Sequence, residues 1–230
     1  MKRIAKTVLC ALFLLLPSRA FDWQDQEHEH THSGLQQYEE RLQRYAVRMY
    51  WQMPLRVMDE LGIGPGMSVA DVGAGIGYFT LKLSKRVGET GQVYASDIDD
   101  NALAFLNRRR KEAGLENVTV IHGRENNPLI PDESVDLVLI VNTIQFIKEK
   151  TVFLNNIRGS LKNNGRLVFV QWDAEKMDSE SPEWDSKDRE LYTMRTMLKM
   201  IYDADYEVLE VKDFLPMQLI YICQPSKSSP

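Results

Sequence analysis

Three glycines stand at alternate positions in the stretch VADVGAGIGYFT, residues 69–80. Gly73, Gly75 and Gly77 have no side chain, so the backbone there can turn sharply and a ligand can approach its N–H and C=O groups. The spacing is G-x-G-x-G, which places Tyr78 where the dinucleotide fingerprint G-x-G-x-x-G requires its third glycine. This loop therefore indicates a ligand site but disfavours a dinucleotide.

Two carboxylates accompany the glycine loop. Asp71 lies two residues before the first glycine. Its charge suits a ligand with an ammonium group better than one with a pyrophosphate. Asp97 follows the apolar segment QVYAS, where a carboxylate can accept hydrogen bonds from both hydroxyls of a ribose. A nucleoside with a charged amino-acid tail satisfies both conditions, and S-adenosylmethionine is the common compound of this kind. The plainer alternative is a glycine turn beside a solvated acid.

Strand-like and helix-like segments alternate around this loop. The predicted strands are 68–72, 92–96, 118–122, 135–141, 166–172, 206–214 and 217–223, and the predicted helices are 35–61, 78–87, 101–113, 151–161 and 189–201. Pro54 is expected to break or restart the first helix. The last two strands are joined too tightly for a crossover helix, so they must be antiparallel. The sequence therefore predicts an α/β, Rossmann-like, seven-stranded and mostly parallel sheet with helices on both faces and an antiparallel C-terminal hairpin.

The chain ends differ in composition from its middle. Residues 1–20 have three cations before a short apolar run and end in small residues, which is the pattern of a secretory signal peptide with cleavage after Ala20. We expect residues 21–34 to be a flexible leader, and we interpret their H-x-H-x-H tract as part of a solvated tail rather than a metal site. We expect one domain over 35–225, with an N-terminal helical extension, and a disordered tail over 226–230. The predicted location is periplasmic or secreted; the alternatives are an uncleaved anchor and a cytoplasmic protein whose signal is not used.

The charge and cysteine content argue against several partners. The formal charge is −5, and the first twenty residues hold four cations and no acid, so the remainder carries −5 − 4 = −9. A chain this acidic is a poor candidate for binding nucleic acid or an anionic membrane surface. After cleavage only Cys223 would remain, so no internal disulfide is expected. We therefore expect a small-molecule partner, with no nucleic acid, no stable membrane insertion after cleavage and no metal; the oligomeric state has no sequence signal.

These segments resemble the class I S-adenosylmethionine-dependent methyltransferases. VADVGAGIGYFT resembles the first family motif, VYASDID the second, GRENNPLIPDESVDLVLIV the third and fourth, and LKNNGRLVFVQW the usual LKPGGRL turn and fifth strand. The similarity covers about residues 55–223. A narrower resemblance is to a bacterial group of often exported methyltransferases. Its R-x-x-W-Q-x-P element reads RMYWQMP at 48–54 here, and its F-L-P-x-Q element reads FLPMQ at 214–218.

The resemblance implies roles for the residues that match family motifs. The glycines would pass close to the methionine and ribose parts of S-adenosylmethionine, Asp71 would lie near its amino group, and Asp97 would hold its ribose. Family members contact the adenine after the third strand, and many have an acid directly after the glycine there, whereas this chain has Arg124 and then Glu125. The expected cofactor residues are Asp71, Gly73, Gly75, Gly77, Tyr78, Asp97, Ile98, Arg124, Glu125, Asn126 and Asn142.

The resemblance also places candidate catalytic residues after the fourth strand. Relatives often have D-x-Y-H-H there, whereas this chain reads NTIQFI. Neither Asn142 nor Gln145 can accept a proton near neutral pH, so a general base is not indicated. An acceptor that is already nucleophilic, such as an amine, thiol or metalloid, would need little help. The expected catalytic residues are Asn142, Gln145 and Trp51. Trp51 and Tyr78 would form a lid and wall at the methyl site and Gln52 a polar contact, although ordinary packing also explains Trp51.

Together these residues predict an S-adenosylmethionine-dependent methyltransferase. In-line displacement needs the nucleophile, methyl carbon and sulfur to be aligned and water to be excluded. Two alternatives remain open. A non-catalytic protein could keep the cofactor pocket, and predicted export supports this because S-adenosylmethionine is made in the cytoplasm. A nucleotide-dependent oxidoreductase is the other alternative, which the glycine spacing and Asp71 disfavour.

Overall fold

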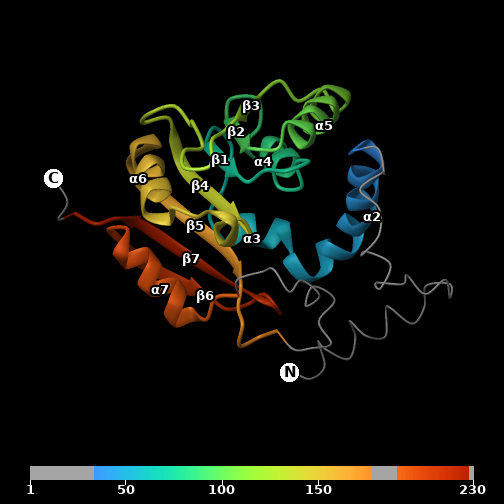
Figure 1. The fold of residues 1–230 in the computed structure, drawn as a ribbon. Coiled ribbons are helices and arrows are strands. Elements are labelled where there is room, and N and C mark those ends of the chain that lie inside the picture. Colours follow the sequence, from blue (N-terminus) through green and yellow to red (C-terminus); the bar gives the residue numbers. More distant parts are fainter. Residues whose placement is uncertain (1–33, 178–190, 228–230) are drawn as a thin grey trace.

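A single seven-stranded sheet forms the centre of the protein in the computed structural model, which describes residues 34–177 and 191–227 (Figure 1). The strands are β1 (Ser68–Val72), β2 (Gln92–Asp97), β3 (Val118–His122), β4 (Val135–Val141), β5 (Leu161–Trp172), β6 (Tyr206–Lys212) and β7 (Gln218–Pro225). Their order in space is β3-β2-β1-β4-β5-β7-β6. All neighbours are parallel except β7, which runs antiparallel to both β5 and β6. The predicted fold class is confirmed.

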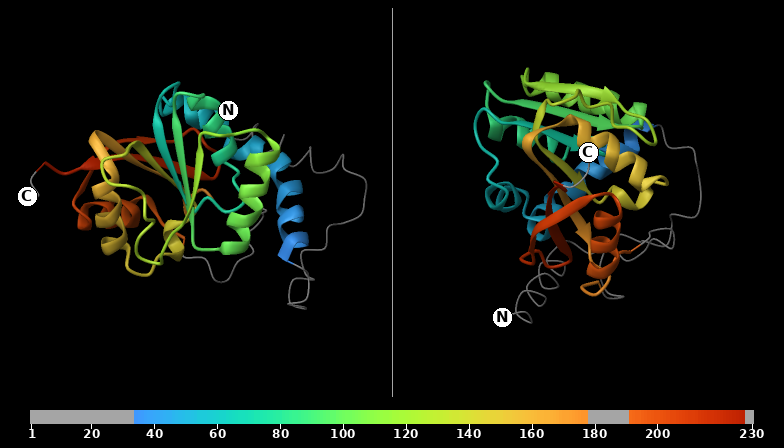
Figure 2. Two further views of the ribbon diagram at one scale, coloured as in Figure 1. Left: turned by 90° about the horizontal axis from the view of Figure 1, so that it is seen from above. Right: turned by 90° about the vertical axis from the view of Figure 1, so that its left-hand side faces the viewer.

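Helices cover both faces of the sheet (Figure 2). They are α2 (Gly34–Gln52), α3 (Pro54–Glu60), α4 (Thr80–Val87), α5 (Asp100–Glu112), α6 (Lys150–Ser160) and α7 (Met194–Asp203), with a 3-10 helix η2 (Ile144–Phe146) after β4. Leu137 and Leu139 of β4 pack in the core that α3, α4 and α5 share, whereas Val138 and Ile140 pack against α6 and α7. This double burial explains the unbroken apolar run of β4.

The structure confirms the expected break of the first helix at Pro54 and changes other element boundaries. The helix over 35–61 is interrupted at Met53, whose φ of 45° is left-handed, and Pro54 begins the next helix. The predicted helix over 78–87 begins only at Thr80, because turns of the glycine loop continue through Phe79. The structure also adds η2, a single turn that periodicity cannot reveal. These differences lie next to the cavity described below, where the backbone departs from regular geometry.

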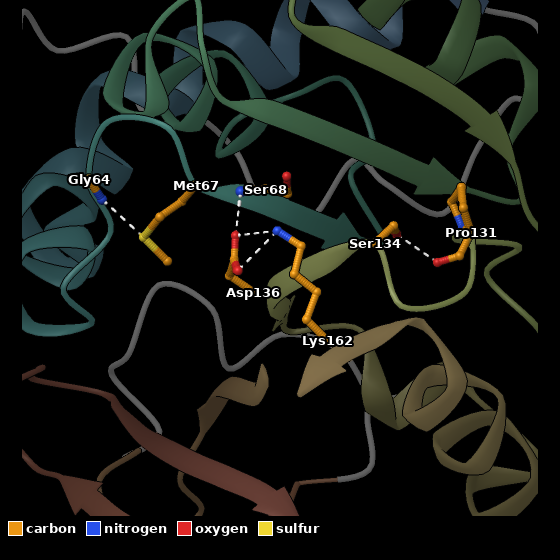
Figure 3. Close-up of polar contacts among 7 residues, drawn as sticks. All are labelled: Gly64, Met67, Ser68, Pro131, Ser134, Asp136 and Lys162. Carbon is orange, nitrogen blue, oxygen red and sulfur yellow. Dashed lines mark hydrogen bonds and ion pairs between the residues drawn. The ribbon is translucent and has the colours of Figure 1, made fainter. Parts of the chain in front are cut away.

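Polar contacts join three strands at the amino edge of the sheet (Figure 3). The carboxylate of Asp136 in β4 accepts a hydrogen bond from the backbone N–H of Ser68 in β1, at 2.8 Å, and contacts Lys162 Nζ in β5, at 3.0 Å. The Asp136 and Lys162 side chains are both more than one-third exposed, so their ion pair contributes about 1 kcal/mol or less. These contacts lie at the amino ends of the parallel strands, opposite to the carboxyl ends.

Some sequence predictions fall outside the described residues. Residues 1–20 and the histidine tract within 21–34 are among them, so the structure does not bear on the predicted signal peptide or leader. Within the described ranges, no helix has the length and apolar character needed to cross a membrane. The same ranges contain no cluster of three or more His, Cys, Asp or Glu side chains that could hold a metal ion.

Candidate functional site

One cavity of about 570 Å³ lies at the carboxyl ends of the parallel strands. It is lined by the loops that follow β1, β2, β3 and β4 and by one side of α2. β1 pairs with β2 on one side and with β4 on the other, so the order in which successive strands are added across the sheet reverses at this point. Ligands of open α/β sheets bind in the crevice at such a reversal. The volume lies within the range of roughly 300–1,000 Å³ that is usual for small-molecule pockets.

The three loop glycines serve different purposes. A side chain at Gly73 would clash with Thr143, and one at Gly77 would clash with Leu106, so these two glycines permit close packing within the protein. Gly75 has a φ of +52°, and a Cβ added there would have no neighbour within 4 Å. It also lines the cavity. Gly75 is therefore the glycine whose missing side chain leaves space for a ligand.

The carboxylate of Asp97 is held in place by two backbone donors. Its Oδ2 accepts from Gly75 N–H at 2.7 Å, and its Oδ1 accepts from Asp99 N–H at 3.0 Å. The side chain is half-buried and lines the cavity. Because each carboxylate oxygen has a second lone pair, both oxygens can still accept hydrogen bonds from a diol. The exposed side chain of Ile98 lies beside it in the lining, where an apolar ring could rest.

Asp71 is a buried acid at the base of the glycine loop. Its Oδ2 accepts a hydrogen bond from Thr80 Oγ1 at 2.6 Å. Burial raises the pKa of Asp71 to about 6, while the Thr80 hydrogen bond and the charge of Arg48 act in the opposite direction. The ionised carboxylate is therefore poorly compensated by the protein alone. A ligand ammonium group in the cavity would stabilise it.

Tyr78 lies between two cations at the cavity wall. The Arg48 guanidinium is 4.3 Å from the centre of the Tyr78 ring, and Lys82 Nζ is 3.7 Å from it. Burial raises the pKa of Tyr78 to about 12, so its hydroxyl stays protonated. That hydroxyl is buried and has no hydrogen-bond partner among the described residues. Buried hydroxyls are usually paired, so this one is an exception among the described residues.

The far end of the cavity contains amides and two tryptophans. Asn142 has a φ of 51°, a conformation that asparagine tolerates better than most residues. Gln145 Nε2 donates to the Asn142 carbonyl at 2.8 Å, and Gln145 Oε1 accepts from Gln171 at 3.0 Å. Trp51 at the end of α2 and Trp172 at the end of β5 are both buried, with ring centres 4.8 Å apart. Asn142, Gln145 and both tryptophans line the cavity.

The structure places the residues predicted from the sequence around this cavity, with three exceptions. Gly77, Asn126 and the buried Gln52 do not line it. A tight turn pairs Arg124 N–H with the Asn127 carbonyl at 2.7 Å, and the Asn126 carbonyl instead accepts from Asn156 of α6 at 2.7 Å. The prediction of Asn126 in the cofactor site is therefore not supported. For the residues that do line the cavity, the assigned roles remain predictions.

Sequence reasoning missed part of the lining. The additional residues include Arg41, Arg44, Tyr45, Thr143, Phe146 and Trp172. Arg41, Arg44 and Arg48 are spaced by three and four residues, which puts them on one side of a helix, so their pattern could have been recognised. Trp172 had no local signal, because only the tertiary fold places the end of β5 beside α2.

Three features together are typical of α/β transferases that bind a nucleoside. They are a glycine loop without the dinucleotide spacing, a carboxylate at the end of the second strand, and a final antiparallel hairpin. Residues 63–213 match the family described as "Methyltransferase domain", and the chain belongs to this family. A crystal structure of an S-adenosylmethionine-dependent methyltransferase from Aquifex aeolicus is similar, with a TM-score of 0.70 and 28% identity. The similarity covers 76% of this chain and 91% of that one. The predicted class I family and its cofactor, S-adenosylmethionine, are confirmed; the narrower exported group stays a prediction.

Two curated relatives are methyltransferases with a quinone in their names. The demethylmenaquinone methyltransferase of Staphylococcus aureus is 34% identical over 116 residues, which are 50% of this chain and 47% of that protein. The ubiquinone/menaquinone biosynthesis C-methyltransferase of Shewanella piezotolerans is 30% identical over 158 residues, which are 66% of this chain and 61% of that protein. This chain thus spans about half to three-fifths of the length of these relatives.

Proposed function

We propose that this chain transfers a methyl group from S-adenosylmethionine to a small-molecule acceptor by in-line displacement. One observation carries the proposal. The same cavity is lined by Gly75 and Asp97 at one end and by Asn142, Trp51 and Trp172 at the other. A cofactor-binding protein without an acceptor would need only the first group. The second group adds two buried tryptophans, against which an acceptor can lie beside the methyl group.

Some residues of the cavity bind S-adenosylmethionine, and others orient the acceptor. Bound S-adenosylmethionine supplies a methyl carbon that is electrophilic because it is attached to a cationic sulfur. Asp97 accepts hydrogen bonds from the ribose, and Asp71 offers its carboxylate to the amino group. Trp51 and Trp172 exclude water and present aromatic faces that a cation favours. Asn142 and Gln145 orient the acceptor but take no proton, since amides are not bases near neutral pH.

A small molecule is the acceptor that the chain properties favour. The formal charge of −5 opposes binding to nucleic acid or to an anionic membrane, and the cavity has the volume of a small-molecule site. The two relatives are methyltransferases with a quinone in their names. Because the acceptor end of the cavity is aromatic, a hydroquinone is the first acceptor to test; its proton would have to pass to water or to a group other than Asn142 and Gln145.

Transfer of a labelled methyl group tests the proposal. Purified protein is incubated with methyl-labelled S-adenosylmethionine and, in separate reactions, a hydroquinone panel and a small-molecule extract of cells. Label in a small-molecule product, lost in Asp97→Ala and retained in Asp100→Ala, supports the proposal. Cofactor binding by calorimetry without any labelled product favours the non-catalytic alternative. Absence of cofactor binding at millimolar concentration would contradict both.

We also propose that the chain is exported, because residues 1–20 have the pattern of a signal peptide. Fusion of residues 1–40 to a reporter that is active only outside the cytoplasm tests this proposal directly. Activity of the fusion, and its loss when Lys2, Arg3 and Lys6 are replaced by Glu, is the expected result. A fusion that stays in the cytoplasm would refute export without affecting the proposed chemistry.

A further inference from the structure

A chain of buried amides connects α2 to the end of β4. Arg48 Nε donates to Gln52 Oε1 at 2.5 Å, Gln52 Nε2 donates to Gln218 Oε1 at 3.1 Å, and Gln218 Nε2 donates to Asn142 Oδ1 at 2.7 Å. The Gln52 and Gln218 side chains are 0% exposed. These two glutamines belong to the RMYWQMP and FLPMQ segments, which are 166 residues apart in the sequence but meet beside the cavity.

The direction of this chain follows from its arginine end. A guanidinium has only donors, so Gln52 must turn its oxygen toward Arg48 and its NH2 toward Gln218. The same reasoning passes to Gln218, which must offer its NH2 to Asn142. Reversing any one of these amides would oppose two donors or two acceptors in a site closed to water. Each such mismatch would cost about 1–3 kcal/mol.

Asn142 therefore presents a donor to the cavity. Its Oδ1 is occupied by Gln218, and no described residue accepts a hydrogen bond from its Nδ2. Asn142 is only partly buried and lines the cavity. Asn142 Oδ1 keeps one lone pair, but the polar atom of this side chain with no partner among the described residues is the amide nitrogen with its two protons. A ligand group opposite it has to accept a hydrogen bond.

The charge of the cavity lining as a whole favours an anionic ligand. Arginine and lysine contribute five charges to the lining, three of them from Arg41, Arg44 and Arg48 of α2, whereas carboxylates contribute three, so the balance is 5 − 3 = +2. The whole chain carries −5. S-adenosylmethionine adds a sulfonium, an ammonium and a carboxylate, which raises the balance by one. A cavity lined by one sign of charge attracts the opposite sign.

We propose that Gln52 and Gln218 are positioning residues that hold Asn142 as a hydrogen-bond donor, and that the acceptor presents a negatively charged oxygen to it. This inference rests on the proposed function and names the acceptor class. If that oxygen is the nucleophile, its lone pair forms the new O–C bond while the C–S bond breaks and the sulfur keeps the electron pair. No proton is released in this step, so Asn142 and Gln145, which are not bases near neutral pH, need not accept one.

Gln52→Glu tests the orientation of Asn142 because it reverses the direction of the hydrogen bonds between Gln52, Gln218 and Asn142 without changing Asn142 itself. The introduced carboxylate would stay ionised beside Arg48, so both of its oxygens accept hydrogen bonds. Gln218 must then turn its NH2 toward that carboxylate and its oxygen toward Asn142. Asn142 in turn directs its NH2 at Gln218 and its oxygen into the cavity. The matched control is Gln92→Glu, the same change on β2 outside the cavity lining.

The probes are benzoate and benzamide, which have nearly the same shape but differ in charge. Their affinities are measured by calorimetry on protein saturated with S-adenosylhomocysteine. Wild type and Gln92→Glu should bind benzoate at least about tenfold more tightly than benzamide. Gln52→Glu should lose this preference or reverse it. Asn142→Asp, which replaces the donor by a carboxylate at the cavity surface, should do the same if Gln52→Glu does not fold.

Two results would overturn the inference. Wild type that binds benzoate no better than benzamide, including no binding of either, contradicts an anionic acceptor. An unchanged preference in both Gln52→Glu and Asn142→Asp contradicts the donor role of Asn142. Binding of S-adenosylhomocysteine is recorded for each variant. If that binding is normal while the probe result is negative, this inference fails but the proposed function does not.

Discussion

Replacing Asp97 by alanine should abolish most of the affinity for S-adenosylmethionine. The Asp97 carboxylate accepts from Gly75 N–H at 2.7 Å and Asp99 N–H at 3.0 Å, and its remaining lone pairs face the cavity. The substitution removes the expected partner of both ribose hydroxyls. It also removes the contact that holds the glycine loop against the end of β2. Both effects weaken binding of the same ligand.

The magnitude follows from the number and kind of hydrogen bonds lost. A hydrogen bond to a charged group contributes about 1.5–3 kcal/mol. Two such bonds to the ribose, taken at the lower end because water can replace the carboxylate, amount to about 3 kcal/mol. Since 1.4 kcal/mol is a factor of ten, the dissociation constant should rise on the order of 100-fold. Release of the Gly75 N–H adds to this loss.

Isothermal titration with S-adenosylhomocysteine measures the effect. The matched control is Asp100→Ala, which removes a carboxylate three residues further along the chain. The Asp100 side chain pairs with His122 at 2.9 Å and is 77% exposed. The control should bind within about threefold of wild type. Thermal unfolding of both variants separates lost binding from lost folding. An Asp97→Ala protein that is folded and binds the ligand as tightly as the control would refute the ribose assignment.

Three further predictions concern the loop, the buried acid and the aromatic end. Gly75→Ala and Gly114→Ala both place alanine at a positive φ with open space around it. Each should therefore cost about 1–2 kcal/mol of folding stability. Calorimetry should show weaker cofactor binding only for Gly75→Ala. The raised pKa of Asp71, about 6, means that the folded protein binds this proton more tightly than the unfolded chain. The free energy of unfolding in urea should therefore fall as the pH rises from about 4 to 6, and Asp71→Asn should make this fall smaller; Asp173, whose pKa burial also raises, keeps its own contribution. Trp51→Phe should lower methyl transfer at least tenfold in a labelled assay while the cofactor dissociation constant changes less than threefold, since Trp51 packs on Trp172 at the acceptor end; equal losses in both quantities would contradict this division.

Features that depend on neighbouring residues could be predicted from the amino-acid sequence. The alternation of apolar strands with helices predicted the sheet and its final hairpin, because a short connection cannot cross between parallel strands. The glycine spacing and the position of Asp97 directly after a strand predicted the cofactor end of the cavity. Pro54 marked a helix boundary because its ring removes a backbone donor. Each of these conclusions needs only local geometry and one rule of chain connection.

Contacts across long separations in the chain came only from the folded structure. It showed that Gly75 leaves space for a ligand whereas Gly73 is confined by Thr143, although the two glycines look alike in the sequence. It also joined Gln52 to Gln218 and so oriented Asn142. No local pattern records such contacts, because the twist of the sheet and the packing of α2 together determine the distance between residues far apart in the chain.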